Sequence, residues 1–167
     1  MTDSTPEVRT GTNFTAAAFG DLAGLGDYTF KHPTLPFEVE GKVFLNSLLG
    51  LTGSEISLNK LPPKASMPFH HKHHINEEVY IFIKGRGEYQ VDDQVFPISE
   101  GTVIRVAPGG VRCWRNLMAE PLYYIVVQAP AGCYKSGTTI SDGKAVEKPV
   151  RWEMEQPREQ GSGRDAP

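Results

Sequence analysis

The stretch PFHHKHHINEEVYIFIKGRG, residues 68–87, contains four histidines, two glutamates, an apolar run and two closely spaced glycines. Side chains alternate between the two faces of a strand, so we expect His71 and His73 to point the same way. Glu78 begins a second predicted strand, residues 78–84, which ends at the glycines. Two imidazoles and one carboxylate form a ligand set suited to a first-row divalent metal ion.

The spacing of these residues resembles the first motif of the cupin superfamily: His-x-His, three or four residues, Glu, six residues, Gly. Here it is His71-x-His73, four residues, Glu78, six residues and Gly85. The glycine that usually stands six residues before the first histidine is Ala65 in this chain. The resemblance implies an all-β double-stranded β-helix, a jelly-roll barrel. It also implies that the barrel holds one divalent transition metal ion, either Fe, Mn, Ni or Zn.

Neighbouring residues offer alternative ligands. Glu77 fits the shorter spacing from the histidines but misses the spacing to the following glycine, so Glu78 is preferred. His74 is a spare donor, although a loop position is expected for it. His70 and Lys72 alternate to the other face and are expected on the surface.

A second cupin motif, Gly, five residues, Pro-x-Gly, two residues, His, three residues, Asn, supplies the last metal-binding histidine. Anchored on Gly101, this motif places Arg112 at the position of the histidine and Asn116 at that of the asparagine. A rival register, shifted by one residue, puts Cys113 there instead and would offer a thiolate ligand. We favour the first register, because Gly101, Gly109 and Asn116 all fit it.

Arginine at this position changes the expected chemistry, because its side chain stays protonated and cannot bind a metal. Arg112 facing inward would present two parallel N–H donors to a carboxylate or phosphate. One interpretation is a three-ligand metal with Arg112 anchoring an anionic substrate. Another is a lapsed metal site that binds a ligand without redox chemistry, and a third has Arg112 turned outward toward a surface acid. Tyr80 and Trp114 are candidate pocket-lining residues, since they share faces with Glu78 and Arg112.

Short strands separated by turns are predicted along most of the chain, with no long helical period. Asp92 and Asp93 mark a tight hairpin turn between two of these strands. The predicted strands, besides the one at residues 78–84, are residues 42–49, 55–61, 88–91, 94–96, 102–106, 112–115 and 122–128. This pattern predicts an antiparallel barrel or sandwich, in agreement with the resemblance.

We expect a single cupin barrel at residues 27–150, with its core at residues 40–130, between flexible arms. Residues 1–26 are predicted to be an N-terminal arm with at most one helical turn. Residues 138–146 are expected to return as an edge strand. Residues 151–167 have almost nothing to bury and are predicted to form a disordered tail.

Composition limits the partners of the chain. The net charge is −3 and there is no basic run, which argues against nucleic acid as a partner. No apolar run has the length of a membrane span, and the N-terminus lacks a secretory signal. Cys113 and Cys133, the two cysteines, show no zinc-like pairing, so we expect reduced thiols in a cytoplasmic protein. The resemblance also favours a homodimer, with the apolar residues 44–51 covering a partner's sheet edge.

The resemblance leaves the activity open, because cupins include dioxygenases, decarboxylases, isomerases, epimerases, storage proteins and ligand-sensing domains. Our leading prediction is a small stand-alone cupin that acts as a metal-dependent oxygenase or isomerase on a small polar or anionic molecule. The alternative is a non-catalytic cupin that binds a small molecule or sugar and has a lapsed or partial metal site. The chain has no helix-turn-helix pattern, so a DNA-binding regulator is not expected.

Overall fold

The computed structural model of the chain describes residues 5–33, 36–135 and 138–152. The chain divides into two compact units, which are Met1–Tyr134 and Lys135–Pro167. Every strand of the described residues belongs to the first unit, and the second contains a short helix, α2 (Thr138–Ser141). Among the described residues, no helix is both long and apolar enough to cross a membrane.

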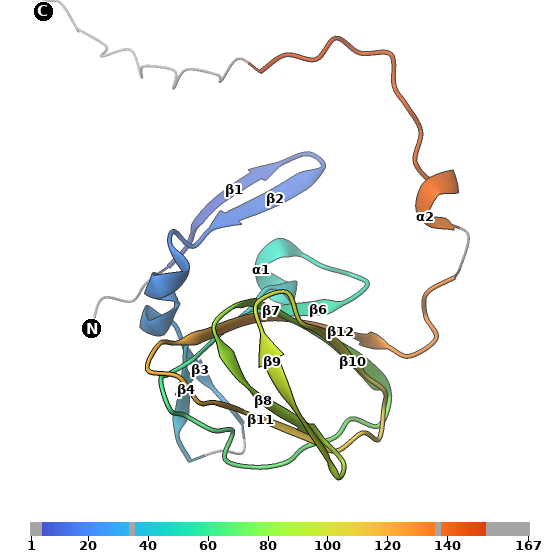
Figure 1. The fold of residues 1–167 in the computed structure, drawn as a ribbon. Helices are drawn as coiled ribbons and strands as arrows, with labels where there is room; N and C mark the ends of the chain where they lie inside the picture. The colour runs from blue at the N-terminus through green and yellow to red at the C-terminus, as the bar shows by residue number, and fades with distance from the viewer. Residues whose placement is uncertain (1–4, 34–35, 136–137, 153–167) are drawn as a thin grey trace, which may run out of the picture. The chain divides into compact units, whose positions relative to one another are not determined.

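The larger sheet has five antiparallel strands and forms one wall of the barrel (Figure 1). Its order is β10 (Val103–Val106), β7 (Asn76–Lys84), β12 (Leu122–Pro130), β6 (Glu55–Leu61) and β5 (Lys42–Phe44). The pairing places Gln128 of β12 directly opposite Glu78 of β7. It also places Lys42 of β5 opposite Asn59 of β6.

The smaller sheet has three strands, in the order β11 (Arg112–Asn116), β8 (Arg86–Val91) and β9 (Gln94–Ser99). The predicted hairpin turn at Asp92 and Asp93 joins β8 to β9, and Asp92 has a φ of 52°. Gly85 makes the turn from β7 into β8 with a φ of 100°, a conformation that suits glycine. A Cβ atom there would lie 2.8 Å from the carbonyl oxygen of Pro121, so this close approach also requires glycine.

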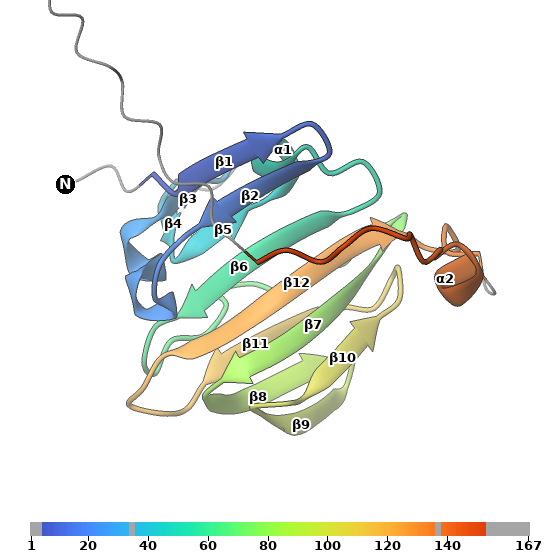
Figure 2. The same cartoon turned by 90° about the horizontal axis from the view of Figure 1, so that it is seen from above.

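Figure 2 shows the strands of the two sheets from above. The sheets enclose a core rich in aromatic residues. Tyr80 and Phe82 of β7 and Tyr124 of β12 contribute from the larger sheet. Tyr89 and Trp114 contribute from the smaller one and stack with their ring centroids 5.6 Å apart. Alternation along β7 and β11 therefore buries the faces that the sequence predicted, and the all-β jelly-roll fold is confirmed.

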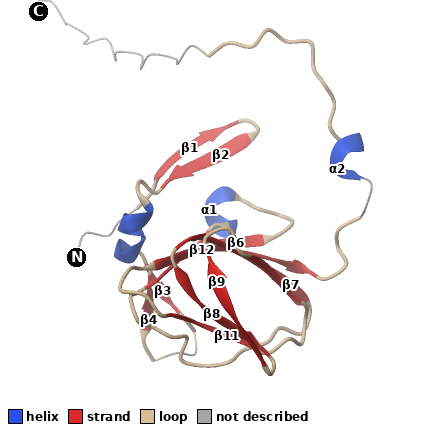
Figure 3. Cartoon of the chain, viewed as in Figure 1, coloured by secondary structure: helices blue, strands red, loops and turns tan. Residues whose placement is uncertain are grey.

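The N-terminal region contains more strand than the sequence predicted (Figure 3). β1 (Glu7–Gly11) and β2 (Phe14–Ala18) form an antiparallel hairpin, and the single helical turn expected in this arm lies after them. A 3₁₀ helix follows (Leu22–Asp27), and then the two-stranded pair β3 (Thr29–Lys31) and β4 (Glu38–Glu40). Pairing with β1 overrides the helix propensity of the alanines, which is weak over so short a run.

Two other sequence predictions need correction. The strand predicted at residues 42–49 stops at Phe44, and helix α1 (Asn46–Leu49) follows. The Glu55 carboxylate accepts hydrogen bonds from the backbone N–H groups of Leu45 and Asn46, at 3.1 and 2.9 Å, which satisfies donors at the start of this helix. The edge strand predicted at residues 138–146 is also wrong, because the chain forms α2 there.

Two further predictions, the disordered tail and the homodimer, are not tested by the structure. Most of the predicted disordered tail, residues 153–167, lies outside the described residues. The homodimer stays a prediction, because the structure contains one chain.

Candidate metal centre

His71 and His73 lie in the irregular segment between β6 and β7, so the strand predicted for them is wrong. The backbone of His71 nonetheless forms an isolated β-bridge with Arg112, with hydrogen bonds of 3.2 and 2.9 Å. The backbone N–H of Gly109 donates to the carbonyl oxygen of His73 at 2.9 Å. These bonds to the segment around β11 hold both imidazoles against Glu78 of β7.

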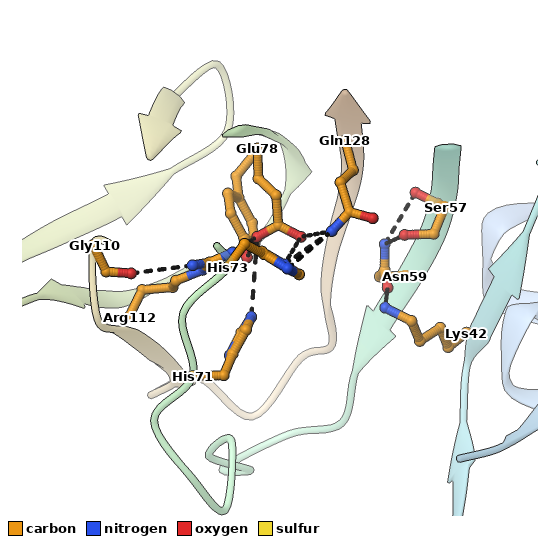
Figure 4. A network of polar contacts seen from close by, with 10 residues as sticks. Lys42, Ser57, Asn59, His71, His73, Glu78, Gly110, Arg112 and Gln128 are labelled. Carbon is orange, nitrogen blue, oxygen red and sulfur yellow. Dashed lines mark hydrogen bonds and ion pairs between the residues drawn. The ribbon is translucent and has the colours of Figure 1, made fainter. Parts of the chain in front are cut away.

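The three predicted donors come together (Figure 4). One ligand atom from each of His71, His73 and Glu78 lies within 4.8 Å of the other two. His73 Nε2 is 3.0 Å from Glu78 Oε1, and His71 Nε2 is 3.9 Å from Glu78 Oε2. Two ligands bound at right angles to one ion at about 2.1 Å would be about 3 Å apart. The donor set therefore fits a divalent transition metal ion, with small adjustments of the side chains.

Glu78 is buried and its carboxylate accepts several hydrogen bonds. The Tyr80 hydroxyl donates to Oε2 at 2.6 Å, and Arg112 Nη2 donates to the same oxygen. Gln128 Nε2 donates to Oε1 at 3.2 Å and lies 2.8 Å from His73 Nε2. Burial raises the pKa of Glu78, but the hydrogen bonds from Tyr80 and Arg112 outweigh burial and lower the pKa below its usual value. Glu78 is therefore ionised at neutral pH.

Arg112 points into the barrel, and its side chain is 1% exposed. Besides Glu78, its guanidinium donates from Nη1 to the carbonyl oxygen of Gly110 at 3.0 Å. Burial lowers the pKa of Arg112, but its hydrogen bonds with Tyr80 and Glu78 outweigh burial and raise it. One interpretation of the sequence had Arg112 anchor an anionic substrate, whose charge would balance that of the guanidinium. Glu78 balances it instead, so charge balance no longer requires an anion at Arg112.

Burial and the nearby Arg112 charge lower the pKa of His71 to about 4. The imidazole is therefore neutral at pH 7 and keeps a lone pair for a metal. Its Nδ1 is buried and has no hydrogen-bond partner among the described residues. Ring contacts position the imidazole, with centroid distances of 5.9 Å to Trp114 and 5.7 Å to His73.

The alternative ligands lie outside the donor group. Glu77 pairs with Arg105, whose Nε donates to it at 2.6 Å. His74 is exposed. The thiol of Cys113 faces the carbonyl oxygen of Met67 at 3.5 Å, on the opposite side of β11 from Arg112.

The predicted pocket-lining residues are part of the packed core. Tyr80 is 1% exposed, and Trp114 is 6% exposed. Burial raises the pKa of the Tyr80 hydroxyl well above its usual value, so it stays protonated and donates to Glu78. Both residues support the donor group, Tyr80 through Glu78 and Trp114 through its contact with His71.

Four polar residues that received no role from the sequence line the neighbouring part of the barrel wall, namely Lys42, Ser57, Asn59 and Gln128. The sequence of β6 alternates polar and apolar residues, and a half-buried strand normally turns its apolar face inward. Here Ser57 and Asn59 are each 3% exposed, while Ile56 and Leu58 are less buried. The alternation of polar and apolar residues was therefore visible in the sequence, but the sequence did not show which face of β6 lies inside the barrel.

Comparison with known proteins agrees with this architecture. Residues 57–128 match the family described as Cupin domain. A solved cupin protein from Bacteroides fragilis is 32% identical and superposes with a TM-score of 0.60. The match covers 71% of this chain and 97% of that one.

Two further relatives are more distant. A sugar phosphate isomerase of the cupin superfamily from Silicibacter pomeroyi is 21% identical and has a TM-score of 0.50, over 54% of this chain and 59% of that one. An uncharacterized protein of Methanocaldococcus jannaschii is 29% identical over 68 residues, which are 41% of this chain. The match spans about half of that curated relative, 54% of its length. By its fold, its motif and its similarity to the Bacteroides protein, this chain belongs to the cupin superfamily.

Proposed function

We propose that this cupin binds one divalent transition metal ion through His71, His73 and Glu78. The protein then acts as a metal-dependent oxygenase or isomerase on a small anionic molecule. The convergence of the three donors carries this proposal. The imidazoles of His71 and His73 are 27% and 29% exposed, so a small molecule can reach them from solvent.

The donor set favours an oxygenase over an isomerase. Two histidines and one carboxylate that leave open positions are typical of non-haem iron oxygenases. A metal ion bound there supplies Lewis acidity, and iron or manganese also supplies redox chemistry. The likeness to the Silicibacter isomerase is one of fold and does not by itself favour isomerisation.

The surrounding residues orient the donors. Tyr80 and Arg112 both hold Oε2 of Glu78, which leaves Oε1 directed toward His73. Gln128 bridges that oxygen and His73 Nε2, so its amide must rotate away from this position when both atoms bind a metal. The hydrogen bonds from Tyr80 and Arg112 orient the Glu78 carboxylate before an ion arrives.

Elemental analysis of protein purified without metal-affinity chromatography tests the proposal. We expect about one iron, manganese, nickel or zinc ion per chain and loss of the ion in the double variant His71→Ala/His73→Ala. The matched control is His70→Ala/His74→Ala, which removes two exposed histidines and should keep the ion. Undiminished metal in the first variant would refute the site, and oxygen uptake by iron-loaded protein would separate an oxygenase from an isomerase.

A second candidate function is metal-free binding of a small molecule. It rests on the contact between Arg112 and Glu78, which neutralises the carboxylate without any metal. Under this alternative, wild-type protein incubated anaerobically with Fe²⁺, Mn²⁺, Ni²⁺ or Zn²⁺ would retain none of them after desalting. Retention of one ion per chain excludes it.

A further inference from the structure

A strip of polar side chains runs along the inner faces of β5, β6 and β12 beside the donor group (Figure 4). This polar strip consists of Lys42, Ser57, Asn59 and Gln128. Three of its members are linked: Lys42 Nζ donates to Asn59 Oδ1 at 3.2 Å, and Asn59 Nδ2 donates to Ser57 Oγ at 3.0 Å. Gln128, on the neighbouring strand β12, contacts Glu78 and His73. Polar groups on an inner barrel face are uncommon unless they serve a ligand or one another.

Lys42 is the one member of the strip that carries a charge, and that charge has no ionic partner. Among the residues that the structure describes, no carboxylate lies within ion-pair distance of its ammonium group. The ammonium group contacts the neutral Asn59 amide and the Phe44 ring, whose centroid is 4.6 Å from Nζ. An ammonium group has three N–H donors, so this environment leaves donors for a ligand.

The electrostatics are consistent with this geometry. Burial lowers the pKa of Lys42, while the negative charges of Glu78 and Glu55 raise it by a smaller amount. Lys42 in turn helps to lower the pKa of His71. Lys42 and the donor group are therefore close enough to influence one another, although no direct contact joins them.

Arg112 is not available to bind an anion. Its side chain is 1% exposed and donates to Glu78 and Gly110, whereas Lys42 is only partly buried. Arg112 and Glu78 form an ion pair, so Lys42 is the cation without an ion pair among the protein groups described around the site, although Glu55 is close enough to raise its pKa. A single ammonium group that contacts a neutral amide and an aromatic ring, without an ion pair, suits a ligand with one negative charge.

We propose that Lys42 is the residue that binds the anionic group of this cupin's ligand, and that the ligand is a small carboxylic acid. The carboxylate accepts hydrogen bonds from the Lys42 ammonium, and the rest of the molecule extends along Asn59, Ser57 and Gln128 toward His71 and His73. The direction of the ligand toward His71 and His73 rests on the proposed metal site. The assignment of Lys42 as the anion-binding residue is independent of that site.

Chemical footprinting of the wild-type protein tests Lys42 without altering the fold. The protein is acetylated briefly at pH 8 with and without millimolar glycolate or pyruvate, and the modification of each lysine is measured by mass spectrometry. We expect either carboxylate to slow acetylation of Lys42 at least fivefold and to leave the exposed Lys31 unchanged. Equal rates with and without both acids would overturn the proposal. Protection by inorganic phosphate alone would also overturn it, because the ligand would then be a phosphate.

Variants provide the second measurement. Lys42→Met keeps the length and apolar stem of the side chain but removes the charge, and we expect glycolate and pyruvate to bind at least tenfold more weakly by calorimetry. Lys42→Arg should retain measurable binding, and Lys31→Met is the control. Unchanged affinity in Lys42→Met overturns the proposal.

Metal content, measured on the same samples, separates the two hypotheses. Loss of carboxylate binding in Lys42→Met at unchanged metal stoichiometry supports both Lys42 and the metal site. Protection of Lys42 in a wild-type protein that binds no metal supports Lys42 and rejects the metal site.

Discussion

The two sides of the barrel interior differ sharply in chemistry. The inner faces of β7, β8 and β11 carry Tyr80, Phe82, Tyr89 and Trp114, which are all buried and pack edge-to-face or stacked. The inner faces of β5, β6 and the end of β12 carry the polar strip. The donor group lies where the two sides meet, since Glu78 is on β7 and its cross-strand neighbour Gln128 is on β12.

This difference separates stability from binding within one small fold. Apolar burial is the dominant favourable contribution to folding, and the aromatic side supplies most of it. The polar strip buries hydroxyl, amide and ammonium groups, which stabilise the fold little even when they are hydrogen-bonded. We therefore infer that the aromatic side maintains the barrel and that the strip is retained for a ligand.

The largest effect is expected on the aromatic side. Phe82 is 1% exposed, and replacing it with Ala removes a buried ring and leaves a cavity. We expect Phe82→Ala to lower the free energy of unfolding by about 3–5 kcal/mol. Urea denaturation measures this loss, and Phe14→Ala is the control, since Phe14 is 52% exposed. A loss as small as the control's would show that the aromatic side does not maintain the barrel.

The next effect concerns the junction of the two sides. Arg112→Met leaves the Glu78 carboxylate buried without its cation, so we expect metal-free protein to lose about 3 kcal/mol of unfolding free energy. The double variant Arg112→Met/Glu78→Gln should recover much of that loss, because no buried charge remains. Equal instability of the single and double variants would mean that Arg112 acts through packing rather than through its charge.

The variant Arg112→His tests the same position through its effect on metal affinity. The substitution removes a cation and adds an imidazole, so we expect metal to bind at least tenfold more tightly, a change of about 1.4 kcal/mol or more. Competition with a chelator of known affinity measures it. Weaker or unchanged metal binding would show that position 112 cannot supply a ligand.

A pH-dependent effect on stability is expected from His71 in metal-free protein. Its pKa is about 4 in the folded chain and about 6.5 when unfolded, so between these values only the unfolded chain takes up the proton. Stability therefore falls as pH decreases from about 6.5 to about 4, by at most about 3 kcal/mol. His71→Gln should remove this part of the pH dependence, whereas His74→Ala should keep it. An NMR titration midpoint for His71 near 6.5 would contradict the shift.

The smallest effect on stability is expected in the polar strip. Lys42→Met replaces a partly buried ammonium that has no carboxylate partner, so the free energy of unfolding should change by less than about 1 kcal/mol or increase slightly. Urea denaturation beside Phe82→Ala makes the comparison direct. A loss similar to that of Phe82→Ala would make Lys42 a structural residue and remove the contrast between the two sides.

Much of the donor group was predictable because its information is local. The spacing of His71, His73 and Glu78 identified the three donors although the predicted strand under the histidines was wrong. The motif register favoured Arg112 over Cys113 at the fourth position, and the structure decided that Arg112 is the inward residue and Cys113 the outward one. The pairing of Arg112 with Glu78 could not be decided from the sequence, because the two residues are 34 positions apart and Glu78 was also expected to bind the metal.

The sequence by itself determined the fold class and the candidate donors, since strand alternation, turns and motif spacing are properties of neighbouring residues. Only the tertiary structure decided which charges meet. Strand order and register place Gln128 beside His73, 55 residues earlier, and turn the polar face of β6 inward to meet Lys42. These long-range pairings depend on how the whole sheet closes, because a shift of one residue in register would exchange its inner and outer faces.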